Sequence, residues 1–206
     1  MPACIMNIIR RPIPGNYREV LNGSIERIQT REVKEIRTYV TRSITTPRAG
    51  VDVTTVRLFN SFDEFEELLD GMDANEGAQR SFDELASKCR SVDFVVGEIM
   101  TPLRGHNSDL RYMTRNVFTA KPGKRSELIE TLMEIRDSHM DGRGAIMRPI
   151  GNFDNVRLTI PHKSMESVRA SLAFIQSPEN KDVYERISSL TTKMERFVSR
   201  IYYPQE

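Results

Sequence analysis

The sequence predicts an α+β fold built from two copies of one β-α-β-β-α-β unit. Short phrases recur about a hundred residues apart, and the clearest is a Pro-Gly pair that opens a helical segment at 14–21 and again at 122–129. Strand-like and helix-like hydrophobic periods also follow one another in the same order in both halves of the chain. A repeat of this length indicates two copies of one structural unit.

The first half contains each element of the unit in turn. A run rich in Ile and Met forms the first strand, and a Pro-rich segment ends it. An apolar stripe of helical period begins at Tyr17 and continues toward Val33. Ser61 and Glu64 have the spacing of a capping box at the start of the next helix, and a further helix runs through Phe82 to Cys89. The predicted strands are 3–10, 37–45, 52–59 and 92–100.

The second half repeats this order with a shorter turn between its central strands. Its predicted strands are 112–120, 144–150, 155–160 and 195–203, and its predicted helices are 124–139, 164–174 and 181–193. Matching residues keep nearly constant separations. The offset is 108 for Gly15 and Gly123, 106 for Arg42 and Arg148, 100 for Val56 and Val156, and 102 for Phe82 and Tyr184. It changes only across predicted loops, where insertions are tolerated.

Each copy therefore predicts the ferredoxin-like split motif, a four-stranded antiparallel sheet with both helices on one side. The other face of such a sheet is bare, and two copies can cover it by packing sheet to sheet. We expect a pseudo-twofold α+β barrel with a first repeat at 1–102, a connector at 103–111 and a second repeat at 112–206.

Composition narrows the function classes. Thirty basic and 29 acidic residues give a net charge of +1, which argues against nucleic acid as a partner because a phosphate backbone selects a concentrated basic face. No apolar run approaches the roughly 18 residues of a membrane span. The first residues lack the basic segment and cleavage site of a signal peptide, and two cysteines make no disulfide framework. We therefore expect a cytoplasmic protein without a membrane partner.

The tandem of strand–Pro-Gly–helix units resembles the dimeric α+β barrel superfamily, in particular its antibiotic-biosynthesis-monooxygenase-like and NIPSNAP-like branches. The resemblance covers nearly the whole chain, from Pro2 to Pro204. It implies a pocket between sheet and helices for a small apolar or aromatic molecule. Activities in that superfamily include cofactor-independent quinone-forming monooxygenases, haem-degrading monooxygenases, haem peroxidases and isomerases.

The haem-degrading branch uses an Asn on the first strand, a Trp and a His on a helix. This chain has Asn7 and Asn116 on its two first strands and His162 just before a helix, but it contains no Trp. That departure disfavours ring-distorting haem chemistry without excluding haem binding. We predict no cofactor and no metal site, because the histidines lack ligand spacing.

Four residues of the second copy are the candidate ligand-binding residues: Tyr112, Asn116, His139 and His162. His162 lies near a strand end, where a pocket could open, although its surroundings also match an ordinary loop into an N-cap. His139 could equally serve as a cation at a helix C-terminus. The alternative for all four is a surface or connector position. No catalytic residue is assigned.

Arginines recur inside strands at Arg42 and Arg148 and at Arg57 and Arg157. A charged residue within a strand faces solvent or needs a partner. Two interpretations remain open, an ion pair across the two sheets with a carboxylate such as Glu98, or anion binding.

We expect a small-molecule-binding protein of the monooxygenase-like barrel type. If it is an enzyme, we expect a cofactor-independent oxygenase that acts on an aromatic or polyketide-like substrate. The alternative is a non-enzymatic ligand-binding or assembly protein. Because one chain already contains two units, we expect a monomer or a weak homodimer.

Overall fold

The computed structural model describes residues 3–29, 38–45, 50–101, 109–140 and 142–204. The strands are β1 (Cys4–Pro12), β2 (Thr38–Thr45), β3 (Val53–Phe59), β4 (Cys89–Ile99), β5 (Tyr112–Ala120), β6 (Ala145–Pro149), β7 (Asn155–His162) and β8 (Thr191–Tyr203). The α-helices are α1 (Tyr17–Gln29), α2 (Phe62–Asp73), α3 (Glu76–Ala86), α4 (Arg125–His139), α5 (Met165–Gln176) and α6 (Lys181–Leu190), and a 3₁₀ turn, η1 (Pro178–Asn180), precedes α6. Within these ranges no helix has both the length and the apolarity to cross a membrane.

The eight strands form one closed antiparallel barrel in the order β1-β3-β2-β8-β5-β7-β6-β4. Each half contributes four neighbouring strands in the ferredoxin-like order, and two seams, β2 with β8 and β4 with β6, join the halves. The predicted fold class, an α+β barrel made by two such units, is confirmed.

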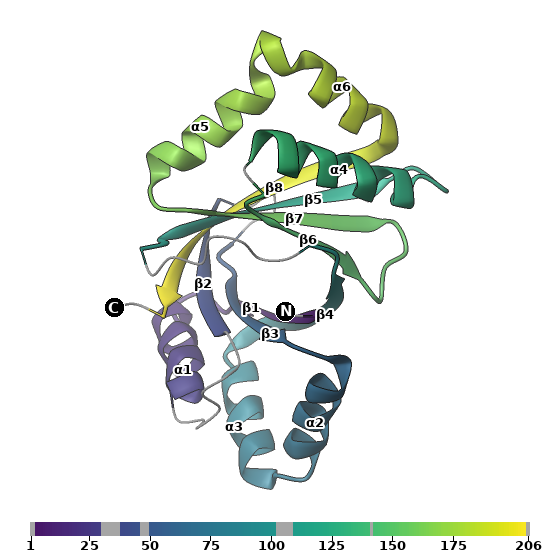
Figure 1. Ribbon diagram of the computed structural model, residues 1–206. Coiled ribbons are helices and arrows are strands. Elements are labelled where there is room, and N and C mark those ends of the chain that lie inside the picture. The colour runs from purple at the N-terminus through teal and green to yellow at the C-terminus, as the bar shows by residue number, and fades with distance from the viewer. Residues whose placement is uncertain (1–2, 30–37, 46–49, 102–108, 141, 205–206) are drawn as a thin grey trace.

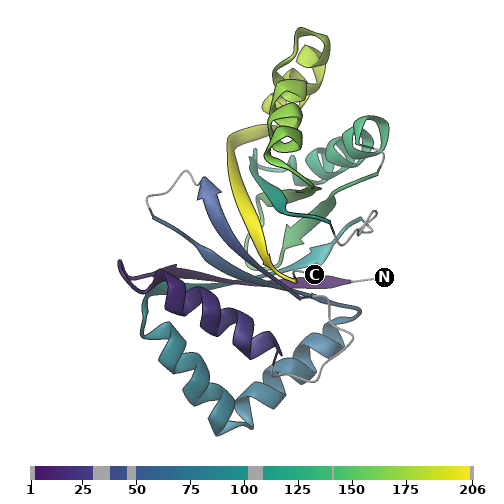
Figure 2. The ribbon, with the colours of Figure 1, turned by 90° about the vertical axis from the view of Figure 1, so that its left-hand side faces the viewer.

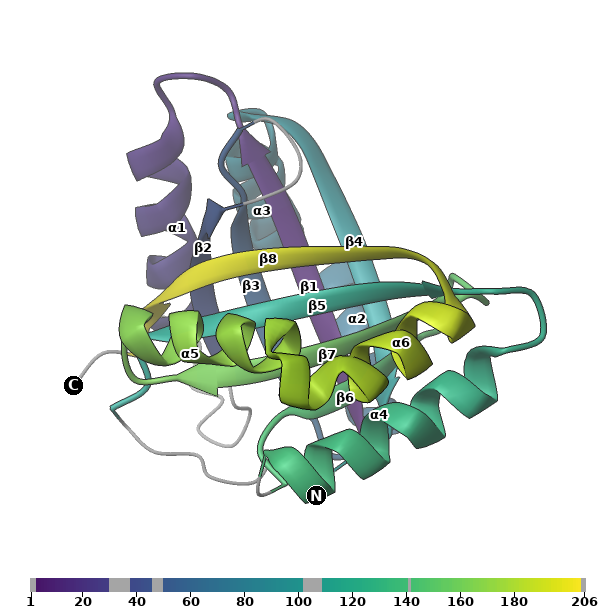
Figure 3. The same ribbon diagram turned by 90° about the horizontal axis from the view of Figure 1, so that it is seen from above.

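The helices form two layers on opposite sides of the barrel (Figure 1). Helices α1 to α3 cover the strands of the first half, and α4 to α6 cover those of the second half. From above, β5, β7 and β8 cross over β1, β3 and β4 at a steep angle, with α5 and α6 outermost (Figure 3). Figure 2 shows the barrel strands between the two helical layers.

Strand register relates the two halves and corrects one sequence match. β1 and β5 begin and end 108 residues apart, and a register shift toward the last strand of each half follows Arg11 in β1 and Thr119 in β5. β3 and β7 are related differently. Cys4 pairs with Phe59, and its counterpart Tyr112 pairs with His162, which is an offset of 103 and not the expected 100.

This three-residue error matters because side chains alternate between the two faces of a strand. An odd shift moves every residue of the match to the other face. Arg57 and Arg157 are therefore not structural counterparts. The partner of Arg57 on β1, Met6, belongs to a core cluster on the helix side, whereas Arg157 faces the barrel interior.

The core lies between each set of strands and its helices. In the second half, alternate residues of β5 and β7 pack against α4 and α6. The members of this cluster that are most buried include Leu128, Leu132, Ile146 and Val156. The first half has two smaller clusters, one around Val20 and Val40 and one around Met6 and Phe59.

Several predicted boundaries move. Cys89 begins β4 instead of ending a helix, and α6 stops at Leu190, so that Lys193 belongs to β8. Ser61 caps α2 as expected, accepting from the amide of Glu64 at 3.1 Å, but the Glu64 carboxylate bonds the amide of Asn60 and not that of Ser61. The predicted helical stretch beyond 29, most of the turn at 46–50, and 103–108 of the connector lie outside the described residues.

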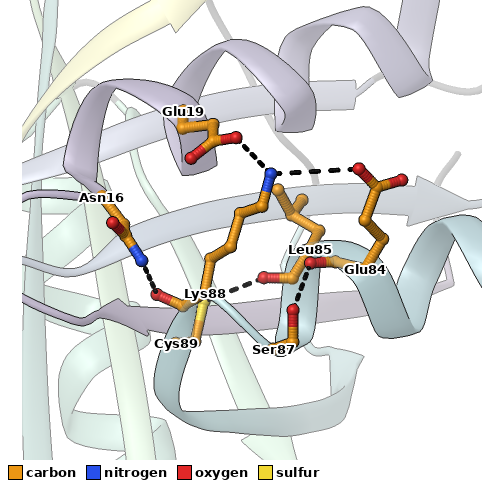
Figure 4. A network of polar contacts seen from close by, with 7 residues as sticks. All are labelled: Asn16, Glu19, Glu84, Leu85, Ser87, Lys88 and Cys89. Atoms are coloured by element: carbon orange, nitrogen blue, oxygen red, sulfur yellow. Dashed lines mark hydrogen bonds and ion pairs between the residues drawn. The ribbon is translucent and has the colours of Figure 1, made fainter.

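A lysine ties the helices of the first half to the start of β4 (Figure 4). The ammonium of Lys88 contacts the carboxylate of Glu19 on α1 and lies 3.9 Å from that of Glu84 on α3. The backbone carbonyl of Lys88 accepts from the Asn16 side chain at 3.5 Å. The short connection from α3 to β4 is thereby fastened to α1.

Candidate functional site

A cavity of about 640 Å³ lies between the strands and the helices of the second half. One part of its wall is apolar: Leu110, Met140, Ile160, Pro161, Ala170 and Phe174. The other part is polar: His139, Arg143, His162, Lys163, Ser164, Ser167 and Ser171. A concave, partly apolar site in which a few polar groups converge is the usual form of a small-molecule site.

His162 is the buried polar group of this cavity. Only 6% of its surface is exposed, and its Nε2 lies 3.1 Å from Oγ1 of Thr114 on the neighbouring strand. Burial, together with the positive charges of Arg196 and Arg143, lowers the pKa of His162 from its ordinary 6.5 to about 4. The imidazole is therefore neutral at pH 7 and can act as a hydrogen-bonding group.

Local sequence explains this position. His162 is the last residue of β7 and pairs with Tyr112, so the strand alternation that places Ile160 in the core turns His162 to the same helix-facing side. Two residues later, Ser164 caps α5 in a capping box with Ser167. The strand end and the helix start thus form the rim of the cavity.

A cationic side chain, that of Arg196, lies beside the cavity and contacts one of its lining residues. Arg196 on β8 lies opposite Asn116 and donates from Nη2 to Oγ of Ser171, which lines the cavity. Its Nε and Nη1 are buried without a hydrogen-bond partner. Burial lowers the pKa of Arg196 from its ordinary 12.5. Spare guanidinium donors close to a cavity favour a ligand oxygen that carries negative charge.

The four sequence-predicted residues are placed differently. His139 and His162 both line the cavity. Asn116 is buried and faces the helices like His162, but its amide donates to the Leu158 carbonyl at 3.3 Å and it is outside the cavity lining. Tyr112 is half-buried and likewise outside the lining. Direct ligand contact by Asn116 or Tyr112 remains a prediction.

Sequence reasoning missed Thr114, Arg143 and Arg196. Thr114 could have been found from strand alternation, because it shares the face of Asn116 on the same strand. Arg196 could have been found from the repeat, since the last strand of each unit lies beside the first. Arg143 carries no local signal, because it belongs to the segment between α4 and β6.

The histidines of this cavity do not fit an iron-bound haem. Nε2 of His162 faces Thr114, and the ring of His139 packs on Phe174 with centroids 5.2 Å apart. Within the described part of the chain, no three His, Cys, Asp or Glu side chains gather as a metal site. His106 lies outside the described residues.

The first half has a smaller cavity, of about 310 Å³, that also lies between sheet and helices. Arginines contribute much of its polar wall, namely Arg10, Arg27 and Arg57. Arg10 is 3% exposed, donates to Thr55 at 2.9 Å, and lies over the ring of Phe82. The two halves therefore differ in the chemistry of their helix-facing cavities.

Solved structures match this architecture over nearly its whole length. A candidate monooxygenase from Fusobacterium nucleatum superposes with a TM-score of 0.73 at 12% identity, covering 97% of this chain and 93% of that one. An anthrone oxidase-like protein gives a TM-score of 0.65 at 13% identity, covering 98% and 92%. A candidate monooxygenase from Lactobacillus acidophilus gives 0.65 at 13%, covering 97% and 94%. These structures share the fold of this chain.

At such low identity the likeness establishes a monooxygenase-like fold and leaves substrate and activity open. No protein-family profile matches the chain, and no curated protein matches it. Function therefore has to be argued from the cavity itself.

Proposed function

We propose that the protein binds a small, largely apolar or aromatic molecule in the second-half cavity and oxygenates it as a cofactor-independent monooxygenase-like enzyme. The observation that carries this proposal is the combination, in one cavity, of apolar walls, the neutral imidazole of His162 and the nearby cations Arg143 and Arg196. The fold shared with candidate monooxygenases and an anthrone oxidase-like protein supports the reaction class.

The charges favour a substrate that reacts as an anion. A phenol or enol that loses its proton to water becomes electron-rich enough to reduce O₂, and the positive field around His162 would stabilise the resulting oxyanion. The overall change converts an activated CH₂ group and O₂ into a carbonyl group and water. With a pKa near 4 the imidazole is a weak base, so we assign His162 a hydrogen bond to the substrate and not proton removal.

Oxygen uptake tests the proposal, with anthrone as the probe. We expect uptake of one O₂ per anthrone, formation of anthraquinone, and a clear loss of rate in His162→Gln and Arg196→Met. Arg42→Met is the matched control, because Arg42 lies on the outer face of β2 and stacks on Tyr17, 4.6 Å from the ring centroid. Equal rates in all four proteins, or no uptake above the buffer rate, would contradict the proposal.

The binding-only alternative predicts a different result in the same samples. A non-enzymatic carrier would bind anthrone or a co-purified molecule, seen by native mass spectrometry, without accelerating oxygen uptake. We also propose a monomer or weak homodimer, and sedimentation at low micromolar concentration would oppose this if it showed a stable higher oligomer.

A further inference from the structure

The interior of the barrel contains two buried arginines. Arg115 on β5 and Arg157 on β7 are each 8% exposed. Both face inward together with Asn7 of β1, and all three residues line the cavities at both ends of the barrel. Two guanidinium charges inside a barrel are costly unless something pairs with them.

Their hydrogen-bond partners are incomplete. Arg115 donates to the hydroxyls of Ser199, at 3.0 Å, and Thr41, at 2.9 Å. Arg157 has a buried Nε without a partner. Among the described residues, no carboxylate forms an ion pair with either guanidinium, although the charge of Asp52 is near enough to favour protonated Arg115.

The electrostatics agree with this geometry. Burial lowers the pKa of Arg115 to about 9, with Arg157 adding to the effect, and burial lowers the pKa of Arg157 to about 10. Both side chains are therefore still cations at pH 7. Arg157 pairs with Val117, two residues along β5 from Arg115, so the two arginines lie on neighbouring strands and on the same inward face.

Space for a ligand lies on both sides of the arginines. The larger cavity, of about 390 Å³, includes Val95, Val117 and Phe197 in its wall. The smaller one, of about 80 Å³, is lined mainly by apolar side chains such as Val56, Met113 and Ile201. A ligand with one anionic group and an apolar body matches this distribution.

At the end of the barrel that contains the larger cavity, the charges are largely neutralised. Arg11 lies 2.7 Å from Asp93 and 3.5 Å from Asp52, and Lys193 lies 3.0 Å from Glu195. Three carboxylates here would repel a dianion more than a monoanion. The unmatched positive charge is therefore inside the barrel, on Arg115 and Arg157.

We propose that the barrel interior is a second ligand site, in which Arg115 and Arg157 bind the carboxylate of a small organic monoacid whose apolar body lies in the larger cavity. The planar guanidinium groups suit a carboxylate, and Asn7 can donate to the same group. This site is separate from the helix-facing cavity that contains His162, and it does not depend on the oxygenase proposal.

Calorimetric titration at constant ionic strength tests the site with benzoate and 2-naphthoate as probes. Benzamide is the neutral control. All titrations are run at pH 8, where inorganic phosphate is mainly the dianion and serves as the dianionic control. We expect saturable binding of the acids, no binding of benzamide and weaker binding of phosphate. Arg157→Met should weaken acid binding at least tenfold, whereas Arg42→Met, which replaces an arginine on the outer face of β2, should bind the acids as the wild type does.

A second variant protects the test against misfolding. Val117→Trp fills the larger cavity while leaving both arginines in place, and it should also abolish acid binding. Removing an unpaired buried charge should leave Arg157→Met at least as stable as the wild type. Unchanged acid affinity in Arg157→Met or Val117→Trp, phosphate binding as tight as that of the acids, or no heat with either acid would overturn the proposal.

Discussion

Lowering the pH from 7 to 4 should destabilise the protein through His162. The folded-state pKa of this residue is about 4 and the ordinary value is 6.5, so the unfolded chain binds a proton in this range that the folded chain does not. The contribution of His162 to the free energy of unfolding is therefore fully present above about pH 6.5 and is lost as the pH falls toward 4. One pKa unit corresponds to about 1.4 kcal/mol, which gives a contribution of up to about 3 kcal/mol.

Urea unfolding measured between pH 8 and pH 4 isolates this contribution by comparison with His162→Gln. Carboxylates throughout the protein also titrate in this range, but they do so in both proteins and cancel in the difference. The wild type should lose up to about 3 kcal/mol more than the variant. His139→Gln is the matched control, since it removes an exposed imidazole from the same cavity and leaves His162 and Thr114 in place. Parallel curves for the wild type and His162→Gln would refute the reasoning.

Three other substitutions have defined effects on the free energy of unfolding, measured by urea titration. Gly97→Ala should destabilise the folded protein by about 2 kcal/mol. An added Cβ would lie 2.8 Å from the backbone oxygen of Arg148 and 2.8 Å from Cγ of Met147. A neutral effect would mean that β4 and β6 move apart easily. Glu98→Gln breaks the exposed ion pair with Arg148, and it should cost only about 0.5 kcal/mol and less in high salt; a cost that does not depend on salt would contradict this. Ser164→Ala removes the cap of α5 and should cost about 1 kcal/mol, whereas Ser164→Asp should retain most of the stability.

The element order was predictable because the repeat constrains it twice. Alternation and helical stripes placed β5 at its exact bounds, 112–120, and α4 within one residue. Of the two interpretations of the strand arginines, an ion pair across the sheets with Glu98 applies to Arg148. These features depend on local period and on the seam between the halves, which the pairing of two sheets implies.

The register of β3 and β7 could not be predicted by matching letters. Val-Arg-Leu occurs in both strands, but the pairing with the first strand shifts the match by three residues. The same residue types in two strands do not show that these residues face the same side of the sheet. Consequently the sequence could not show that Arg157 points into the barrel while Arg57 points toward the helices.

A helix-facing cavity lies in the second half, where the sequence predicts one, but the sequence names only part of its lining. His162 and His139 line it, whereas the hydroxyl beside His162 comes from Thr114. That contact depends on which residues of β5 and β7 lie opposite each other. Such pairing is set by the whole sheet, and no single segment of sequence contains it.

Closure of the barrel couples the two halves thermodynamically. Each half alone would leave β2 and β4, or β6 and β8, with an unpaired edge, and the seams β2 with β8 and β4 with β6 supply the missing partners. Unfolding of either half breaks both seams at once and exposes the inner face of the other half. The unfolding of one half therefore destabilises the other. Although the sequence consists of two repeats, the protein should unfold as one cooperative unit, because a closed barrel has no stable state with half of its strands missing.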